Sequence, residues 1–201
     1  MASKQVAIVD SGGANIASLR FALDRLGVAS LLTTDADELR AASHVILPGV
    51  GAAEDAMQRL KARNLDRLLP TLEQPVLGIC LGMQLLATAS AEDDANCLGI
   101  LDGRAEKLDA EPGLPVPNMG WSQVTWQQAH PISKGIDDGS YFYFVHSYAL
   151  PALPETIATS HHSSEFSAIV ARDNFVATQF HPERSSDAGA QLLSNFVEMA
   201  A

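Results

Sequence analysis

Short apolar segments alternate with segments of helical periodicity over the first eighty residues of this 201-residue chain. Residues 5–10 (QVAIVD) are typical of a buried strand. After them, apolar side chains recur three or four positions apart until Gly27, which is typical of a helix that ends at a glycine. The same order repeats, with further strands predicted at residues 29–33, 44–47 and 76–79. Such an alternation predicts a parallel sheet with helices on both faces.

The second half of the chain has more strands and fewer helices. Strands are predicted at residues 122–126, 141–148, 166–171 and 175–180, with a hairpin turn at 172–174 and a closing helix over 187–199. Other helices are predicted at 16–26, 35–42 and 52–69, the last broken near Asn64. We therefore expect an α/β fold: a single three-layer domain over residues 1–201, with a central, mostly parallel sheet, helices on both faces and an added antiparallel portion in the second half.

Charge and composition exclude several classes of partner. The net charge of −11 repels phosphate backbones and anionic lipid, so neither nucleic acid nor a membrane surface is expected as a partner. No apolar run approaches the roughly 20 residues that cross a bilayer. Residues 1–5 lack the organisation of a secretory signal, and two cysteines make no disulfide framework, so we expect a cytoplasmic protein.

One cysteine lies between two glycines, in Gly78-Ile79-Cys80-Leu81-Gly82, where a predicted strand meets a helix-like run over residues 81–89. A side chain on so sharp a turn leaves little room for Cβ atoms on either side, which is what the glycines avoid. The start of a helix also favours a thiolate. A lone cysteine in an apolar context is ordinarily a small buried hydrophobe, which is our interpretation of Cys97. The glycines favour a nucleophile at Cys80.

A base and its orienting carboxylate are predicted a hundred residues later, in His181-Pro182-Glu183. Pro182 disfavours helical backbone at His181, so we expect an extended segment in which His181 and Glu183 share a face. A cysteine, a histidine and a carboxylate together are typical of covalent acyl transfer.

The loop Pro48-Gly49-Val50-Gly51 also follows a predicted strand. Open α/β sheets place their sites at the carboxyl ends of parallel strands, where this loop, Cys80 and His181 are all expected. The two glycines leave the backbone free to turn its N–H groups toward a ligand. We assign the N–H groups of Val50 and Leu81 as an oxyanion hole.

These segments resemble the class I glutamine amidotransferases, a family with a Cys-His-Glu triad. Within that family, the chain is similar to the glutaminase subunits of imidazole glycerol phosphate synthases. The further segments that carry this similarity are residues 13–18 (GANIAS), 48–51 (PGVG), 118–121 (NMGW) and 143–148 (YFVHSY). They cover nearly the whole chain in the order expected.

The resemblance implies a role for each residue of the site. Cys80 is implied as the nucleophile, His181 as the acid and base, and Glu183 as the residue that orients His181. It also implies contacts with the substrate glutamine, from Gly49, Gly51, Gln84, His146, Ser147 and Tyr148. Glutamine is hydrolysed to glutamate and ammonia, and no cofactor is implied. The pair His161-His162 lacks other ligands at metal spacing, so no metal is expected either.

A partner protein is implied as well. In such synthases the ammonia passes to the cyclase (synthase) partner, a (β/α)₈ barrel that forms imidazole glycerol phosphate and AICAR in histidine biosynthesis, and the two proteins form a heterodimer. We expect Asn15, Trp121 and Arg184 at the interface. Two residues depart from the family pattern: Asn118 stands where histidine is usual, and Ser122 where asparagine is usual.

Three alternatives remain at this point. A glutaminase that feeds anthranilate, purine or pyridoxal phosphate synthesis has the same triad, although residues 118–121 and 143–148 argue against it. A stand-alone cysteine hydrolase of γ-glutamyl bonds needs no partner. A non-catalytic interaction protein predicts an impaired triad, whereas all three residue types are present here.

Overall fold

The computed structural model describes residues 5–12 and 15–200. The predicted absence of a secretory signal rests on residues that lie almost entirely outside this range, and so do Gly13 and Ala14 of the 13–18 segment. None of the helices within the described residues is long and apolar enough to cross a membrane.

The first half of the chain forms the predicted strand–helix repeat. Strands β2, β1, β3 and β4 lie side by side in that order and are all parallel. The break predicted near Asn64 is present, because its φ of 56° separates two helices. The elements are β1 (Gln5–Val9), α1 (Ile16–Arg25), β2 (Ala29–Thr33), α2 (Ala36–Ala41), β3 (His44–Gly49), α3 (Ala53–Ala62), α4 (Leu65–Leu68), β4 (Val76–Cys80) and α5 (Leu81–Leu86).

The second half continues the same sheet in antiparallel fashion. Strand β14 (Phe175–Thr178) pairs with β4 in parallel, and β13 (Ser164–Arg172), β12 (Thr156–His162) and β9 (Thr125–Trp126) follow antiparallel. Two small sheets are added: β10–β8, and β11–β7–β5–β6. Their strands are β5 (Ala89–Ser90), β6 (Ala95–Asn96), β7 (Arg104–Lys107), β8 (Asn118–Gln123), β10 (Tyr141–His146) and β11 (Tyr148–Ala149), and the closing helix is α6 (Ser186–Glu198). The predicted α/β fold is confirmed.

One predicted helix end is wrong here, and one strand was missed. The helix predicted to run to residue 89 ends at Leu86, and Ala89 begins β5 instead. Strand β12 was not predicted, because Thr156, Thr159 and Ser160 interrupt its apolar pattern. All three side chains are nevertheless buried, since the strand lies between two neighbours and each hydroxyl finds a partner inside the fold.

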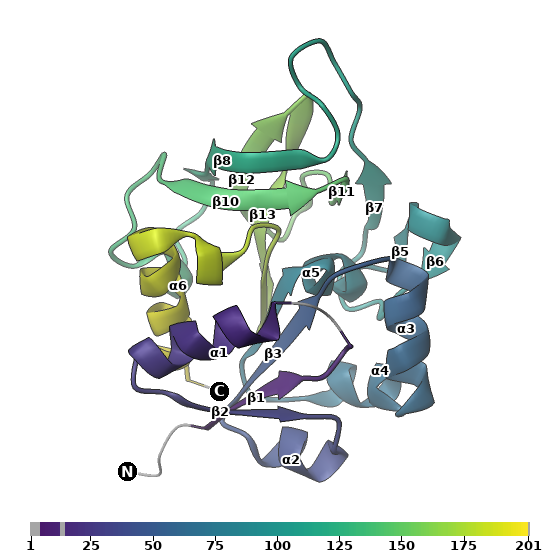
Figure 1. The fold of residues 1–201 in the computed structure, drawn as a ribbon, viewed down its shortest axis with the longest axis vertical. Helices are drawn as coiled ribbons and strands as arrows, with labels where there is room; N and C mark the ends of the chain where they lie inside the picture. The colour runs from purple at the N-terminus through teal and green to yellow at the C-terminus, as the bar shows by residue number, and fades with distance from the viewer. Residues whose placement is uncertain (1–4, 13–14, 201) are drawn as a thin grey trace.

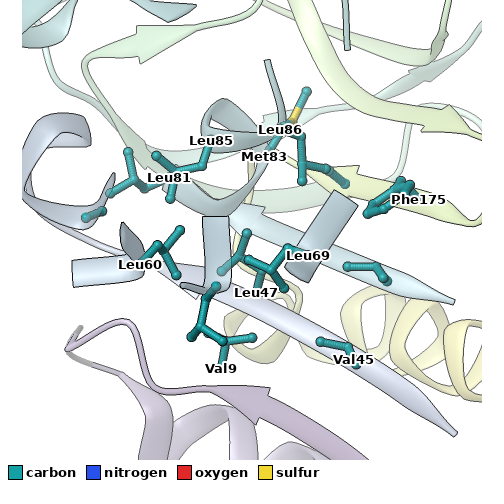
Figure 2. Packing of buried hydrophobic residues seen from close by; sticks show 14 of the residues in the cluster. Val9, Val45, Leu47, Leu60, Leu69, Leu81, Met83, Leu85, Leu86 and Phe175 are labelled. Atoms are coloured by element: carbon teal, nitrogen blue, oxygen red, sulfur yellow. The ribbon is translucent and has the colours of Figure 1, made fainter. Parts of the chain in front are cut away.

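The core lies on both faces of the central sheet. Alternate residues of β1 point to opposite faces. Val6 and Ile8 pack with α1 and α6, whereas Ala7 and Val9 pack with α3 and α5. Figure 1 shows α1 and α6 on one side of the sheet and α3 and α4 on the other. Figure 2 shows the core on the α3 and α5 side of the sheet from close by, where Val9, Leu47, Leu60, Leu81 and Leu85 converge.

Close packing of α5 on the sheet depends on glycine. A Cβ on Gly82 would lie 1.9 Å from the carbonyl oxygen of Leu47, and a Cβ on Gly78 would lie 2.9 Å from the carbonyl oxygen of Gly82. Neither position admits a side chain unless the backbone moves. The prediction that both glycines are needed at this turn is confirmed, and their packing holds Cys80 at the end of β4.

Candidate active site

Cys80 occupies a strained turn between β4 and α5. Its φ of 55° and ψ of −111° lie outside the regions that an L-residue ordinarily adopts. Such strain costs on the order of 1–3 kcal/mol and persists only where the surroundings impose it. Here the close packing of Gly78 and Gly82 imposes it. The turn leaves the Cys80 side chain lining a cleft above the carboxyl ends of the parallel strands.

Sheet topology brings His181 to the same edge. Strand β14 lies next to β4, with Ala177 paired to Gly78 and Thr178 paired to Ile79. His181 follows β14 by three residues, as Cys80 ends β4, so both lie at the carboxyl ends of adjacent strands. The backbone N–H of His181 donates to the carbonyl of Tyr143 on β10 at 3.0 Å, which holds the segment in place.

His181 and Glu183 contact each other, although not as predicted. The expected extended segment is wrong beyond His181, because Pro182–Arg184 form a short 3-10 helix. This turn brings the Glu183 carboxylate back toward the imidazole, and Nδ1 of His181 lies 2.8 Å from Oε1 of Glu183. Both side chains are almost fully buried. Nε2 of His181 makes no hydrogen bond with the described residues and remains available to a ligand.

The surroundings favour the imidazolium form of His181. Burial lowers its pKa, but the nearby Cys80 sulfur and the Glu183 carboxylate outweigh burial and raise the pKa to about 10. The Cys80 sulfur raises the pKa of His181 because it lies near the imidazole, although no hydrogen bond of ordinary geometry joins the sulfur to Nε2. A histidine of this kind holds a proton that it can give to a departing group.

Asn15 adds a contact that the sequence analysis missed. Its side-chain Nδ2 donates to Oε1 of Glu183, the same oxygen that His181 contacts. Asn15 precedes α1 and has a φ of 78°, and the entry into this helix places its amide against the Glu183 carboxylate. Predicted only at a partner interface, Asn15 thus also helps to fix the carboxylate that orients His181.

The cleft of about 410 Å³ collects most of the predicted residues. They come from the ends of β4 and β14, from the loop after β3, and from the junction of β10 and β11. The residues that line it are Asn15, Val50, Gly51, Cys80, Leu81, Gln84, Glu92, Pro117, Val145, His146, Ser147, Tyr148, His181 and Arg184. Gly49 lies just behind this cleft, against a smaller cavity shared with His181 and Glu183.

The glycine loop lies against the turn that carries Cys80. Gly49 pairs with Cys80 across β3 and β4, and a Cβ on Gly49 would lie 2.9 Å from both the Gly82 nitrogen and the Leu81 Cβ. Gly51 has a φ of 90°, which suits glycine. The backbones of Val50 and Leu81 therefore meet at one end of the cleft. Their role as an oxyanion hole stays a prediction.

A chain of amide hydrogen bonds leads to the Cys80 sulfur. Nε2 of Gln84 donates to the carbonyl of Tyr148 at 2.8 Å and to Oε1 of Gln179 at 3.1 Å. Nε2 of Gln179 then lies 3.8 Å from Cys80 Sγ. Both donors of the Gln84 amide are therefore used within the protein, and its oxygen is the part left for a substrate. The sequence analysis missed Gln179, whose position next to Phe180 and His181 carried no sign of a contact with Cys80.

His146 is a buried, neutral histidine in the cleft wall. Nδ1 lies 2.9 Å from the Tyr148 carbonyl and donates to it, so Nε2 accepts from Nδ2 of Asn118 at 3.1 Å. Burial lowers the pKa of His146, the bond to the Tyr148 carbonyl raises it, and the nearby His162 and His181 lower it; together they bring this pKa to about 4. Asn118, one of the two departures from the family pattern, thus lies inside the cleft wall.

Glu92 is a second residue that the sequence analysis missed. Its carboxylate lines the cleft and accepts from the backbone N–H of Ala53 at 3.0 Å. Burial raises its pKa, the bond to Ala53 lowers it, and the neighbouring Asp93 raises it. Glu92 stands in a 3-10 helix of three consecutive acidic residues, which by itself is typical of a solvated surface segment.

An exposed aromatic group flanks the cleft. Trp121 on β8 is 52% exposed and meets the Tyr143 ring edge-on, with centroids 6.0 Å apart. The Arg184 guanidinium lies over the same ring, 5.4 Å from its centroid. Arg184 also lines the cleft, so the rim carries a cation that lies over the Tyr143 ring. Within the described residues, no three His, Cys, Asp or Glu side chains are grouped so that they could hold a metal ion.

Comparison with known proteins assigns the family. The model of the family "Glutamine amidotransferase class-I" matches residues 7–200. This chain belongs to the class I glutamine amidotransferases. It is therefore an enzyme of that family, as its residues predicted.

Relatives of this glutamine amidotransferase extend over nearly its full length. It is 50% identical to imidazole glycerol phosphate synthase subunit HisH 2 of Legionella pneumophila (strain Paris) over 194 residues, or 96% of this chain and 98% of the relative. It is 48% identical to subunit HisH of Yersinia pseudotuberculosis over 195 residues, or 96% and 99% of the two chains. The resemblance inferred from residues 118–121 and 143–148 is confirmed.

Solved structures share the fold of this glutamine amidotransferase. A putative GMP synthase component from Thermoplasma acidophilum has a TM-score of 0.73 at 21% identity and covers 98% of this chain and 94% of its own. A glutamine amidotransferase from Thermotoga maritima has a TM-score of 0.69 at 16% identity and covers 99% and 100%. At such identities the likeness shows the α/β fold alone.

Proposed function

We propose that this chain is the glutaminase subunit of an imidazole glycerol phosphate synthase. It hydrolyses glutamine and delivers the ammonia to a cyclase subunit in histidine biosynthesis. The observation that carries the glutaminase activity is the arrangement of Cys80, His181 and Glu183 at one edge of the sheet, around a cleft large enough for an amino acid. The names of relatives at 48–50% identity support the choice of synthase.

The cleft suits glutamine at both of its ends. Glu92 lines the cleft and offers a carboxylate to the α-ammonium group, and Ser147 and Tyr148 offer polar groups to the α-carboxylate. The oxygen of the Gln84 amide faces the side chain of the substrate, because its nitrogen is already bonded to Tyr148 and Gln179. A neutral His146 holds the Tyr148 carbonyl without adding a charge.

In the first half-reaction, the Cys80 thiolate attacks the side-chain carbonyl carbon of glutamine. The N–H groups of Val50 and Leu81 stabilise the oxyanion that forms. His181 Nε2 then gives its proton to the departing nitrogen, the C–N bond breaks, and ammonia leaves a γ-glutamyl thioester on Cys80.

In the second half-reaction, the now neutral His181 takes a proton from water. The hydroxide attacks the thioester carbon, the C–S bond breaks, and glutamate leaves with the Cys80 thiolate restored. Glu183 keeps Nδ1 of His181 protonated, so that Nε2 is the nitrogen that moves the proton in both steps. Asn15 holds Glu183 in place through its amide.

The partner is a cyclase of the (β/α)₈-barrel type that forms a heterodimer with this chain. Ammonia released into bulk water would be protonated and diluted, so the cleft rim must dock against the partner. Arg184 lies on this rim, and Trp121 lies beside it in a neighbouring hollow that both residues line. Met119, 68% exposed, stands two residues from Trp121 on the same face of β8. Exposed aromatic and arginine side chains are enriched in protein interfaces.

Reconstitution with purified partners tests the proposal. Glutamate formation is measured for this chain by itself, with the cyclase, and with the cyclase plus its nucleotide substrate. We expect a large increase only in the last mixture, together with formation of the imidazole product. The synthase component of an anthranilate synthase is the matched control partner. High turnover with no partner would favour a stand-alone γ-glutamyl hydrolase, and activation by the control partner would favour another synthase.

A further inference from the structure

We propose that Gln179 is a hydrogen-bond donor to the nucleophile, which holds the Cys80 sulfur in its thiolate form through both half-reactions. The inference rests on the proposed function, because it takes Cys80 as the nucleophile. With this inference, Gln179 becomes a fourth functional residue of the site, beside Cys80, His181 and Glu183.

The position of Gln179 is fixed by the fold. It lies directly after β14, is fully buried, and its backbone N–H donates to the Ala168 carbonyl of β13 at 2.9 Å. Because β14 and β4 are adjacent and parallel, its side chain reaches the end of β4, where Nε2 lies 3.8 Å from Cys80 Sγ. This distance is within the range of an N–H group donating to sulfur.

The orientation of the Gln179 amide is fixed by Gln84. The Gln84 nitrogen can only donate, and it donates to the Tyr148 carbonyl and to Oε1 of Gln179. Oε1 of Gln179 must therefore face Gln84, which leaves the N–H₂ group facing the sulfur. The Tyr148 carbonyl also accepts from Nδ1 of His146, whose Nε2 accepts from Asn118. The direction of every amide in this chain of bonds follows from its neighbours.

The two contacts of the sulfur have opposite effects on its charge. The Val145 carbonyl lies 3.7 Å from Cys80 Sγ and can accept only from the protonated thiol. Nε2 of Gln179 donates, so its contact strengthens as the sulfur becomes negative. A thiolate loses the first contact and gains strength in the second. Gln179 therefore favours the thiolate at rest and again when the sulfur leaves the thioester.

A role in packing alone is the competing explanation. Gln179 could merely satisfy Oε1 with the Gln84 amide and fill a buried space. That role makes no statement about the ionisation of Cys80. The two explanations therefore differ in one measurable quantity, the pH at which alkylation of Cys80 is half-maximal.

The experiment measures alkylation of Cys80 by iodoacetamide against pH, with mass spectrometry to separate Cys80 from Cys97. Gln179→Met keeps the length of the side chain but removes the donor, and Gln179→Glu still accepts from Gln84 while turning an oxygen toward the sulfur. We expect the alkylation profile of Gln179→Met to move to higher pH by about one pH unit, because a hydrogen bond to a charged group is lost, and that of Gln179→Glu to move further. The kcat for glutamine should fall about tenfold in Gln179→Met.

Two further variants keep the test decisive. Gln84→Met removes the amide that orients Gln179, and we expect its alkylation profile to move to higher pH by a smaller amount. This variant also tests the inference if Gln179→Met does not fold. Gln127→Met is the matched control, since Gln127 donates a similar bond to Thr159 away from the cleft. Unchanged alkylation profiles in the folded Gln179 or Gln84 variants would overturn the inference. The proposed function fails separately, if Cys80→Ser keeps its glutaminase activity.

Discussion

His181 and Glu183 contact each other across one turn of 3-10 helix, with Nδ1 and Oε1 2.8 Å apart and both side chains almost fully buried. Pro182 begins this turn, so a single proline both ends the extended segment and folds the carboxylate back under the imidazole. The same carboxylate oxygen accepts from Asn15. The histidine is thus oriented by a residue two positions away and by one that lies just before the first helix of the chain.

The first prediction concerns Glu183. Glu183→Gln removes the negative charge that raises the pKa of His181, so His181 loses its proton at lower pH than in the wild type. We expect kcat to fall on the order of 10- to 100-fold, with the alkaline limb of kcat moved to lower pH and KM for glutamine nearly unchanged. A pH series of glutaminase rates measures both effects. Glu198→Gln, on the exposed end of α6, is the control, and an unshifted alkaline limb contradicts the assignment.

The second prediction separates the two cysteines. Cys80→Ser keeps the shape of the turn but offers a hydroxyl of much higher pKa, so we expect glutaminase activity to fall by roughly two to four orders of magnitude. Cys97→Ser should keep full activity, because Cys97 lies outside the cleft and burial raises its pKa to about 11. Circular dichroism checks that both variants fold. An active Cys80→Ser variant would sink the assignment of the nucleophile.

The third prediction concerns acid stability. Burial lowers the pKa of His146 to about 4, against an ordinary value near 6.5. The unfolded chain therefore binds more protons at this residue, and folding stability falls as pH drops from about 6.5 to 4, by on the order of 3 kcal/mol. His181, whose pKa is raised, contributes no slope in this window, because both its folded and unfolded states are protonated below the ordinary value.

Urea unfolding of His146→Gln across this pH range tests the prediction. We expect the variant to be less stable than the wild type at pH 7, since it disturbs the bonds to Asn118 and Tyr148, but to lose less stability toward pH 4. His161→Gln is the control, because His161 is exposed near the end of β12. Parallel stability curves for His146→Gln and the wild type would show that His146 is not the titrating group.

The fourth prediction concerns the turn that carries Cys80. Gly82→Ala places a Cβ 1.9 Å from the Leu47 carbonyl oxygen, so α5 must move away from the sheet. We expect a loss of stability above about 4 kcal/mol, or no folded protein. Gly99→Ala is the matched control: its φ is 69°, but nothing lies within 4 Å, so only backbone strain of about 1 kcal/mol is expected. Equal melting temperatures for the two variants would contradict this interpretation of the turn.

The fifth prediction concerns the proposed interface. Arg184 is exposed at the cleft rim and stacked on Tyr143, with its charge available to a carboxylate of the partner. Arg184→Glu should weaken binding of the cyclase by at least about tenfold, or uncouple glutamine hydrolysis from the cyclase substrate. A titration of glutaminase rate against the cyclase measures both. Arg63→Glu, at the exposed end of α3, makes the same charge change elsewhere, and identical titrations would remove Arg184 from the interface.

Much of this architecture could be predicted from local patterns. The strand–helix repeat, the break at Asn64 and the glycines beside Cys80 each depend on residues close together in sequence. Strand β12 escaped prediction, because its buried Thr159 and Ser160 side chains find their partners, Gln127 and Gln123, more than 30 residues away. Helix α5 ended early for a similar reason, since residues after Leu86 bond to β7 and neighbouring loops instead of continuing the helix.

The sequence by itself determined which chemistry is possible here, through a cysteine held between glycines and a histidine two residues from a glutamate. Only the tertiary structure decided how that chemistry is arranged. Asn15 and Glu92 come to the cleft, and Gln179 comes to the Cys80 sulfur, from three separate parts of the chain, and each acts through a long-range contact. A local pattern records which conformations a segment prefers. Contacts between distant segments arise only when the parallel pairing of β3, β4 and β14 brings their carboxyl ends to one edge.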